Sequence, residues 1–597
     1  MNTPLLSVPG RLFWCALGAL SIAFHLTLIF SGLVPNLISR PLHMALALPW
    51  ILVLPALVSD KPRLVSQLTG IMLCVVGISA CLYVAHNQSA LGDQYGFLVG
   101  DFQIALAVAL LAVVLEMARR AIGWPLPMVA ALALAYGIWG QHLPGKFGYP
   151  GIPLQSFLGT LTIAEGGLWG SLTGVSVSIV AIFVIFGAVL NAGEAGAGFM
   201  NLATAAAGRL RGGAAKVSVI SSALFGSISG SASANVASTG AITLPAMRRL
   251  GYPKSFAGAV EAVASSGGQI MPPLMGAGAF VMVELTGTPY TGIMAAAFLP
   301  ALLYFVTVWV GVNGFAHRYG LQGLSAEDSP SLKTVLITSA FFAIPFVVLL
   351  ERMFVGGFTP QYAACVAILF AAILLLFDGR LSLSWTRTVA RMENVCMTAG
   401  KQIATIAAII LCASIVIGVL GLTGLGVKIT SLILSASGGT LWGALLLTGL
   451  ACLVLGMEVP TTAAYVICVS VAGPALQQLG MPLLMTHLFV FWFALLSTIT
   501  PPVCGAVFIA AGMVEENWLR VALSAMALGV GLYIVPLAMV ANPDLIALGT
   551  APVAALAMFG KVGTGLAAVS MGIIRPFHPA IRLALVAVGI IILFLPV

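Results

Sequence analysis

Charged residues are scarce in this sequence: aspartate, glutamate, lysine and arginine make up 7% of its 597 positions, against roughly a quarter in an ordinary soluble domain. So few charges cannot cover a water-exposed surface. Hydrophobic residues make up 60% of the chain, so the bilayer is the expected solvent and helices are the expected spanning elements. The composition therefore predicts an all-α polytopic membrane protein.

Patterns typical of catalytic and metal sites are also missing. The nine cysteines form no Cys-x-x-Cys pair, and the seven histidines form no His-x-x-x-His or His-Glu-x-x-His pattern. We therefore expect no enzymatic activity, no cofactor and no transition metal. The net charge of +8 comes from basic residues in short loops between apolar runs, so we expect no nucleic-acid partner and interpret these residues as orientation signals.

Residues 1–120 hold four apolar stretches, at 12–34, 42–58, 64–84 and 102–118. Loops that hold basic residues alternate along the chain with loops that hold few or none. Arg11, Lys61 and the pair Arg119 and Arg120 lie in loops of the first kind, whereas residues 85–101 hold no basic residue. The positive-inside rule then puts both ends of this unit in the cytoplasm. Further spans are expected near 124–140 and 175–190, and the whole chain should hold about fifteen.

The apolar segment 217–247 has a polar centre, GSISGSASANVASTG, at residues 226–240. Glycine and serine weaken helices, so two half-helices that meet at an unwound tip are the expected form. Basic residues flank both ends, with Lys216 before and Arg248 after. Because both ends then lie on one side of the membrane, we predict a re-entrant hairpin.

The next apolar segment, residues 255–285, is interrupted by SSGGQIMPP at 265–273. Paired prolines and glycines break a helix here at mid-membrane depth. Freed backbone groups cost several kcal/mol each in lipid unless protein, water or an ion satisfies them. The break therefore predicts a lined cavity.

The same pattern recurs later in the chain at an offset of 229 residues, which places GMEVPTTAA on the first tip and ALLSTITPP on the first break. Three prolines of the first copy have a counterpart in the second copy at this offset: Pro245 and Pro474, Pro253 and Pro482, and Pro272 and Pro501.

The flanking charges do not recur. Arg248 and Arg249 correspond to Gln477 and Gln478, so the second hairpin is expected to enter from the opposite side. Paired broken helices in an inverted repeat indicate a secondary-transporter site at the midplane. The alternative for any single small-residue run is ordinary helix packing, but two broken pairs at one offset favour the transporter.

The sequence resembles the large membrane subunit of the tripartite ATP-independent periplasmic (TRAP) transporters, and above all the fused permeases that work with TAXI-type binding proteins. The motifs that carry the resemblance are GSISGSASAN at Gly226, LPAMRRLGYP at Leu244, SSGGQIMPPLMGAGAF at Ser265 and TPPVCGAVFIA at Thr500.

The resemblance implies three parts. Residues 1–120 would be a four-helix scaffold like the small subunit, and residues 121–541 a permease with a hairpin and broken helix at 217–289 and again at 441–514. Residues 542–597 would be a two-helix extension. It also implies an elevator mechanism in a bacterial inner membrane, cation-coupled import of a small organic anion with a carboxylate, and a periplasmic solute-binding protein of TAXI type as partner.

The hydroxyl groups and freed carbonyls at the tips and breaks are uncharged oxygen ligands. Such ligands are suited to binding a solute and Na⁺. The residues expected to bind the solute are Ser231, Ser233, Asn235, Thr461 and Thr462. The residues expected to bind the cation are Ser229, Ser231, Asn235, Ser266, Gly267, Ile270, Glu458, Thr462, Thr498 and Thr500. Half-helix N-termini at the tips add positive dipole ends that favour an anion.

Three carboxylates are expected at membrane depth, where charge is costly and usually functional. Glu458 lies in the second tip and is a candidate proton carrier, so H⁺ coupling stays open beside Na⁺. Glu261 and Glu284 are interpreted as lying near a helix end or facing the scaffold. Lys401 begins a long uncharged run and is interpreted as an anchor that reaches the membrane surface.

Three other functions are compatible with parts of this pattern. A channel also uses re-entrant hairpins, but it usually gains its pore from oligomeric symmetry. A secondary transporter of the same fold without a binding protein is the closest alternative. An intramembrane enzyme ranks last because no catalytic cluster is visible.

No loop is long enough to be a solute-capturing domain. The solute is therefore expected to be captured at the membrane site or on another chain, and in the second case loops 85–101 and 140–151 are the expected docking surface.

Overall fold

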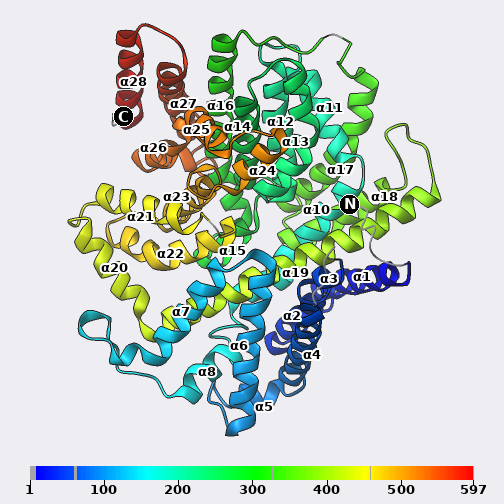
Figure 1. Ribbon diagram of the computed structural model, residues 1–597, viewed down its shortest axis with the longest axis vertical. Coiled ribbons are helices and arrows are strands. Elements are labelled where there is room, and N and C mark those ends of the chain that lie inside the picture. Colours follow the sequence, from blue (N-terminus) through cyan, green and yellow to red (C-terminus); the bar gives the residue numbers. More distant parts are fainter. Residues whose placement is uncertain (1–7, 59–63, 326, 458, 596–597) are drawn as a thin grey trace.

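The computed structural model describes residues 8–58, 64–325, 327–457 and 459–595 (Figure 1). These residues form helices throughout, and the one β-type contact among them is an isolated bridge between Phe377 and Leu383. Nine of the described helices are long and apolar enough to cross a membrane, and shorter apolar helices accompany them. The all-α polytopic architecture is therefore confirmed, while the total of about fifteen spans stays a prediction.

The N-terminal helices form one group at the bottom of Figure 1. They are α1 (Val8–Phe30), α2 (Asn36–Leu52), α3 (Leu54–Val58), α4 (Leu64–His86), α5 (Gln88–Gly92), α6 (Gly100–Ile122), α7 (Pro125–Trp139) and α8 (Leu154–Thr162). The packing of α2 on α4 depends on Gly70, since a Cβ there would lie 2.2 Å from the Leu52 carbonyl oxygen. Arg120 also donates to that oxygen at 3.0 Å and joins α6 to the pair.

The central helices lie mostly above this group in Figure 1. They are α9 (Ser171–Val175), continued by a π-helical turn (Ser176–Val180), α10 (Ala181–Ala192), α11 (Ala195–Ala207), α12 (Gly213–Ser229), α13 (Ala232–Arg249), α14 (Lys254–Gly267), α15 (Ala277–Thr286), α16 (Tyr290–Tyr319), α17 (Leu332–Phe354) and α18 (Pro360–Leu374).

The C-terminal half begins with α19 (Trp385–Thr423), which at 39 residues is about 58 Å long. The helices after it are α20 (Leu425–Ala436), α21 (Leu441–Leu455), α22 (Thr461–Gln478), α23 (Leu483–Leu496), α24 (Gly505–Val514), α25 (Trp518–Leu528), α26 (Val535–Ala541), α27 (Pro552–Ile574) and α28 (Pro579–Phe594). Figure 1 shows α19 running across the molecule between the blue N-terminal helices and the green and yellow ones. Its buried side chains belong to both hydrophobic cores, with Ala408 and Leu411 in one core and Ile403 and Ile410 in the other.

The internal repeat is confirmed by the helix boundaries. The bounds of α13 and α14 return in α22 and α23 at the predicted offset of 229 residues. Each hairpin is followed by a helix that ends in a short 3-10 turn, Gly268–Ile270 in the first copy and Ser497–Ile499 in the second. The predicted half-helices and mid-helix breaks are thus present in both copies.

The last two helices, α27 and α28, pack against each other, and α27 also packs on α16. Lys561 of α27 donates to the Asn542 side chain at 2.7 Å and to the Leu595 carbonyl at 2.6 Å, which holds the end of α28 in place. The division of the chain into three functional parts stays a prediction.

Candidate functional site

The first hairpin turns at Gly230, between the end of α12 and the start of α13. Gly230 has a φ of +59°, which favours glycine, and the Ser231 hydroxyl caps α13 by accepting from the Ala234 N–H at 3.4 Å. A Cβ at Gly230 would lie 3.1 Å from the Met275 carbonyl oxygen and the Gly276 Cα. The tip is therefore held closely against the segment that begins α15.

The second hairpin has a longer connection between α21 and α22, and Glu458 within it lies outside the described residues. Pro460 precedes α22 as its N-cap. The Ser497 hydroxyl donates to the Gly456 carbonyl at 2.9 Å, so this tip too is tied to the break that follows its own hairpin.

The two breaks meet each other inside the protein. The Ser266 and Thr498 hydroxyl oxygens are 2.9 Å apart and join the first repeat to the second. On the other side of the first break, Gly226 of α12 packs on Gly268, since a Cβ at Gly226 would lie 2.4 Å from the Gly268 Cα. Both tips and both breaks thus belong to one packed centre.

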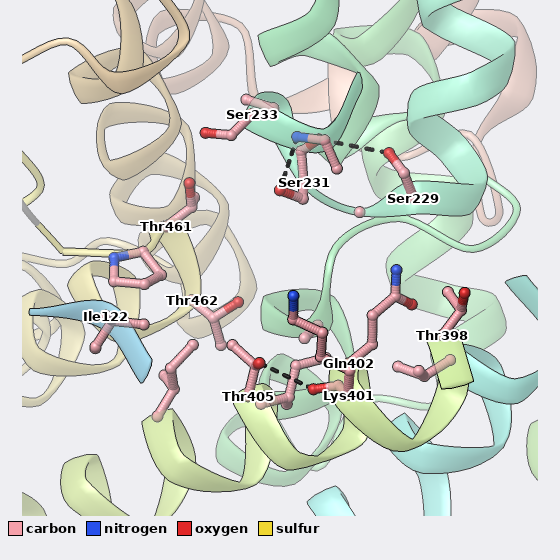
Figure 2. Close-up of a pocket in the computed structure, with 18 of the residues that line it drawn as sticks. Ile122, Ser229, Ser231, Ser233, Thr398, Lys401, Gln402, Thr405, Thr461 and Thr462 are labelled. Carbon is pink, nitrogen blue, oxygen red and sulfur yellow. Dashed lines mark hydrogen bonds between the residues drawn. The ribbon is translucent and has the colours of Figure 1, made fainter. Parts of the chain in front are cut away.

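A cavity of about 1620 Å³ lies at this centre, bounded by both tips, both breaks and one face of α19 (Figure 2). Six of the predicted site residues line it: Ser229, Ser231, Ser233, Thr461, Thr462 and Thr498. The other described ones lie behind the wall: Asn235, Ser266, Gly267, Ile270 and Thr500. The structure therefore brings the hydroxyls of the two repeats together around a single space.

The residues behind the wall are engaged with the protein. The fully buried Asn235 amide donates to the Ser222 carbonyl at 2.8 Å and to the Ser265 carbonyl at 3.2 Å. The Thr500 hydroxyl donates to the Leu496 carbonyl at 2.7 Å and lies 2.7 Å from the Tyr533 hydroxyl. In this structure the side chains of Asn235 and Thr500 therefore brace the tips and breaks. Ligand binding by these residues stays a prediction.

Four helices begin at the cavity wall. Their first residues, Ala232 of α13, Ala277 of α15, Thr461 of α22 and Gly505 of α24, all line the space. Helix N-termini carry partial positive charge and unpaired N–H groups, so this arrangement favours an anion. Gln269 also lines the cavity, and its side-chain nitrogen is buried with no hydrogen-bond partner among the described residues.

Glu261 is surrounded by hydroxyl groups in the core of the first repeat. Its carboxylate accepts from Ser218 at 2.8 Å, Ser265 at 3.2 Å and Ser222 at 3.5 Å, and also from Thr239 and Thr243. These five hydroxyls come from α12, α13 and α14. The interpretation that Glu261 lies near a helix end or faces the scaffold is therefore wrong.

A sequence signal for this cluster exists. Ser218 and Ser222, Thr239 and Thr243, and Glu261 and Ser265 are each four residues apart and so share a helix face. In the second repeat the corresponding positions hold no carboxylate or hydroxyl: Leu447, Ala451, Cys468, Ala472, Val490 and Ala494. The polar core is thus a property of the first repeat alone.

The sequence also predicts the placement of two other charged residues, Glu284 and Lys401. Glu284 is exposed near the end of α15, so its placement near a helix end is confirmed. Lys401 lines the cavity, and Figure 2 shows its side chain extending from α19 toward the tips. Its side chain therefore faces the cavity, while the interpretation of Lys401 as an anchor at the membrane surface stays a prediction.

Comparison with known proteins gives a consistent result. The family described as "Tripartite ATP-independent periplasmic transporter, DctM component" matches residues 109–554. The C4-dicarboxylate TRAP transporter large permease protein DctM of Pseudomonas aeruginosa is 27% identical over 333 residues, which are 54% of this chain and 74% of that protein. The isethionate TRAP transporter permease protein DctMQ of Oleidesulfovibrio alaskensis is 24% identical over 423 residues, 67% of this chain and 65% of its own length.

Proposed function

The chain belongs to the DctM family of tripartite ATP-independent periplasmic (TRAP) transporters, and we propose that it imports a small organic anion by coupling to a cation gradient. The predicted family is thereby confirmed, as is a multi-pass protein of the bacterial inner membrane. The chain is a large permease component of a secondary transporter, and such permeases work with a periplasmic solute-binding protein.

One observation carries the proposal: two hairpin tips from different halves of the chain and two helix breaks surround one cavity. Broken helices that meet from two repeats are the usual construction of a secondary-transporter site. Figure 1 shows the first hairpin, α12 and α13, and the second, α21 and α22, approaching this centre from different directions. Opposite entry of the two hairpins is part of the proposal.

An anionic solute is supported by the electrostatics of the wall. The four helix N-termini present partial positive charge to the space. Two relatives are named for a C4-dicarboxylate and for isethionate, which carry carboxylate and sulfonate groups. A carboxylate is the solute group that we propose for this chain, bound by the tip hydroxyls of Ser231, Ser233, Thr461 and Thr462.

Sodium is the proposed coupling ion. The breaks supply neutral oxygen ligands, and the contact between Ser266 and Thr498 places hydroxyls of both repeats side by side. Neutral carbonyl and hydroxyl oxygens at broken helices are typical Na⁺ ligands in secondary transporters. Proton coupling through Glu458 is the alternative, and the stabilisation experiment described below distinguishes the two.

An elevator movement of the hairpin region against a scaffold that includes α19 is the proposed mechanism, with a TAXI-type binding protein as the partner. The match to a fused DctMQ protein supports a scaffold contribution from the N-terminal helices. These helices pack on α19 through α1, α2, α6 and α7. The loops at 85–101 and 140–151 are the proposed docking surface for the binding protein.

The cation proposal is tested without knowledge of the solute. Na⁺, compared with choline, should raise the unfolding temperature of the purified protein, because an ion that binds only the folded state stabilises it. Thr498→Val should lower the apparent Na⁺ affinity about tenfold, equivalent to about 1.4 kcal/mol. Thr564→Val is the matched control, since this threonine also donates to its own helix but lies on α27 outside the cavity.

Unchanged Na⁺ stabilisation in Thr498→Val would reject the proposed cation site. Stabilisation by low pH instead of Na⁺, lost in Glu458→Gln, would support the proton alternative.

A further inference from the structure

One face of α19 is polar where it borders the cavity. Asn394, Thr398, Lys401, Gln402 and Thr405 all line the space. Asn394, Thr398, Lys401 and Thr405 follow one another at three- and four-residue steps, and Gln402 is adjacent to Lys401, so they form a stripe along one side of the helix. From Val395 onward the other faces of this helix are largely buried in the two apolar cores, so a polar stripe there indicates contact with water or a polar solute.

The charges that line the cavity are few. Among the described lining residues they are Arg11, Glu393 and Lys401. Arg11 donates to Glu393 at 2.8 Å, so these two charges largely cancel each other. Lys401 forms no ion pair with a described residue, and its ammonium group points toward the tips in Figure 2. The described wall thus carries a net positive charge at Lys401.

Other parts of the cavity wall are complementary to the same kind of ligand. They present the four helix N-termini and the buried side-chain nitrogen of Gln269, which has no hydrogen-bond partner among the described residues. N–H groups donate and an ammonium attracts, so these groups and Lys401 all favour a solute with anionic oxygen atoms. A lysine is suited to this role because its flexible stem carries a compact charge into the space.

We propose that Lys401 is the scaffold-side anion-binding residue of the transport cavity and that it selects solutes with a carboxylate or sulfonate group. This inference rests on the proposed function and adds a binding residue from outside both repeats. Because Lys401 belongs to α19 and the tips belong to the hairpins, the solute contacts both parts in this state. Movement of the hairpins along α19 would then separate the solute from Lys401.

The test measures the electrostatic effect of Lys401 directly. A cysteine is introduced at Thr405, which lines the cavity one turn beyond Lys401 and donates to its carbonyl at 2.9 Å. Its modification rate is measured with an anionic sulfonatoethyl and a cationic trimethylammonium-ethyl methanethiosulfonate, and the protein without the new cysteine gives the background. Removing one positive charge a few ångströms away should lower the anion-to-cation rate ratio by about threefold to tenfold.

The expected ratio is therefore high with Lys401, retained in Lys401→Arg, lowered in Lys401→Gln and lowest in Lys401→Glu. Lys333→Gln, which removes an exposed lysine at the start of α17, is the matched control and should leave the ratio unchanged. A ratio that does not change in Lys401→Gln overturns the proposal.

A second measurement separates this inference from the function on which it rests. A panel of short carboxylates and sulfonates, with succinate and isethionate included, is tested for protection of the new cysteine. Protection that is lost in Lys401→Gln and retained in Lys401→Arg supports the anion-binding role, whereas equal protection in both variants overturns it. If no anion of the panel protects the unmodified Lys401 protein, the anionic solute of the proposed function is rejected, and the rate ratio still decides the electrostatic role of Lys401.

Discussion

Glu261 provides the sharpest test of how the first hairpin is held together. Its fully buried carboxylate is the common acceptor for hydroxyls on α12, α13 and α14. Replacing it with alanine removes this acceptor from all three helices at once. We expect Glu261→Ala to destabilise the protein mainly by loosening this hairpin.

The expected loss of stability depends on whether each hydroxyl finds another hydrogen-bond acceptor when the carboxylate is removed. Each hydroxyl has a single proton to donate. Thr239 and Thr243 can return to carbonyls of their own helix, at 2.8 Å to Asn235 and 3.1 Å to Thr239. Ser218 and Ser265 have no comparably short acceptor among the described contacts. Two buried donors left without an acceptor, at about 1–3 kcal/mol each, lower the free energy of unfolding by about 2–6 kcal/mol.

The assay is unfolding of the detergent-solubilised protein by increasing SDS, with hydrogen exchange of α12–α14 measured in parallel. Glu284→Ala is the matched control, since Glu284 is exposed at the end of α15, and it should cost less than about 0.5 kcal/mol. Glu261→Gln keeps the volume and one acceptor oxygen and should fall between the two. Equal stability of Glu261→Ala and Glu284→Ala would refute the argument that this carboxylate ties the three helices together.

Three further predictions concern other parts of the chain. Cysteines at Arg249 and Gln478 should be accessible to impermeant thiol reagents from opposite sides of the membrane, and access to both from one side would refute the inverted repeat. Gly226→Ala should cost about 1–3 kcal/mol because its Cβ would lie 2.4 Å from the facing break, whereas Gly421→Ala, with no atom within 4 Å, should not destabilise the protein. The loop hydroxyl and N–H groups that donate to Asp378 lower its pKa, so Asp378→Asn should be less stable than the native protein at pH 7. This difference should shrink as the pH falls below the ordinary value of 3.8, and a difference independent of pH would contradict it.

Much of the hairpin architecture could be predicted because its signals are local. Glycine and serine at 226–240 and the proline pairs at Pro272 and Pro501 break helices wherever they occur, and their recurrence at one offset gives the repeat. The helix boundaries agree because these residues act on their own backbone. The sides from which the hairpins enter are predicted from the basic flanks at Lys216 and Arg248.

The surroundings of charged residues were harder to predict because they depend on how helices rotate against one another. Glu261 meets hydroxyls from two other helices; the four-residue spacings place each polar pair on one helix face but do not show that the three faces meet. In the sequence, Lys401 stands at the start of a long uncharged run, which suggests the start of a membrane span. The helix α19, however, begins earlier, at Trp385. Lys401 therefore lies 16 residues, or about 24 Å, along the helix, and the length of α19 carries it into the cavity.

The central claim is that this permease couples solute import to a cation and receives the solute from a periplasmic binding protein. The most direct measurement is uptake into proteoliposomes with an imposed Na⁺ gradient, with and without the loaded binding protein encoded beside the permease. We predict that uptake requires both the inward Na⁺ gradient and the binding protein. Full-rate uptake by the permease alone, or uptake that is indifferent to the Na⁺ gradient, would contradict the claim.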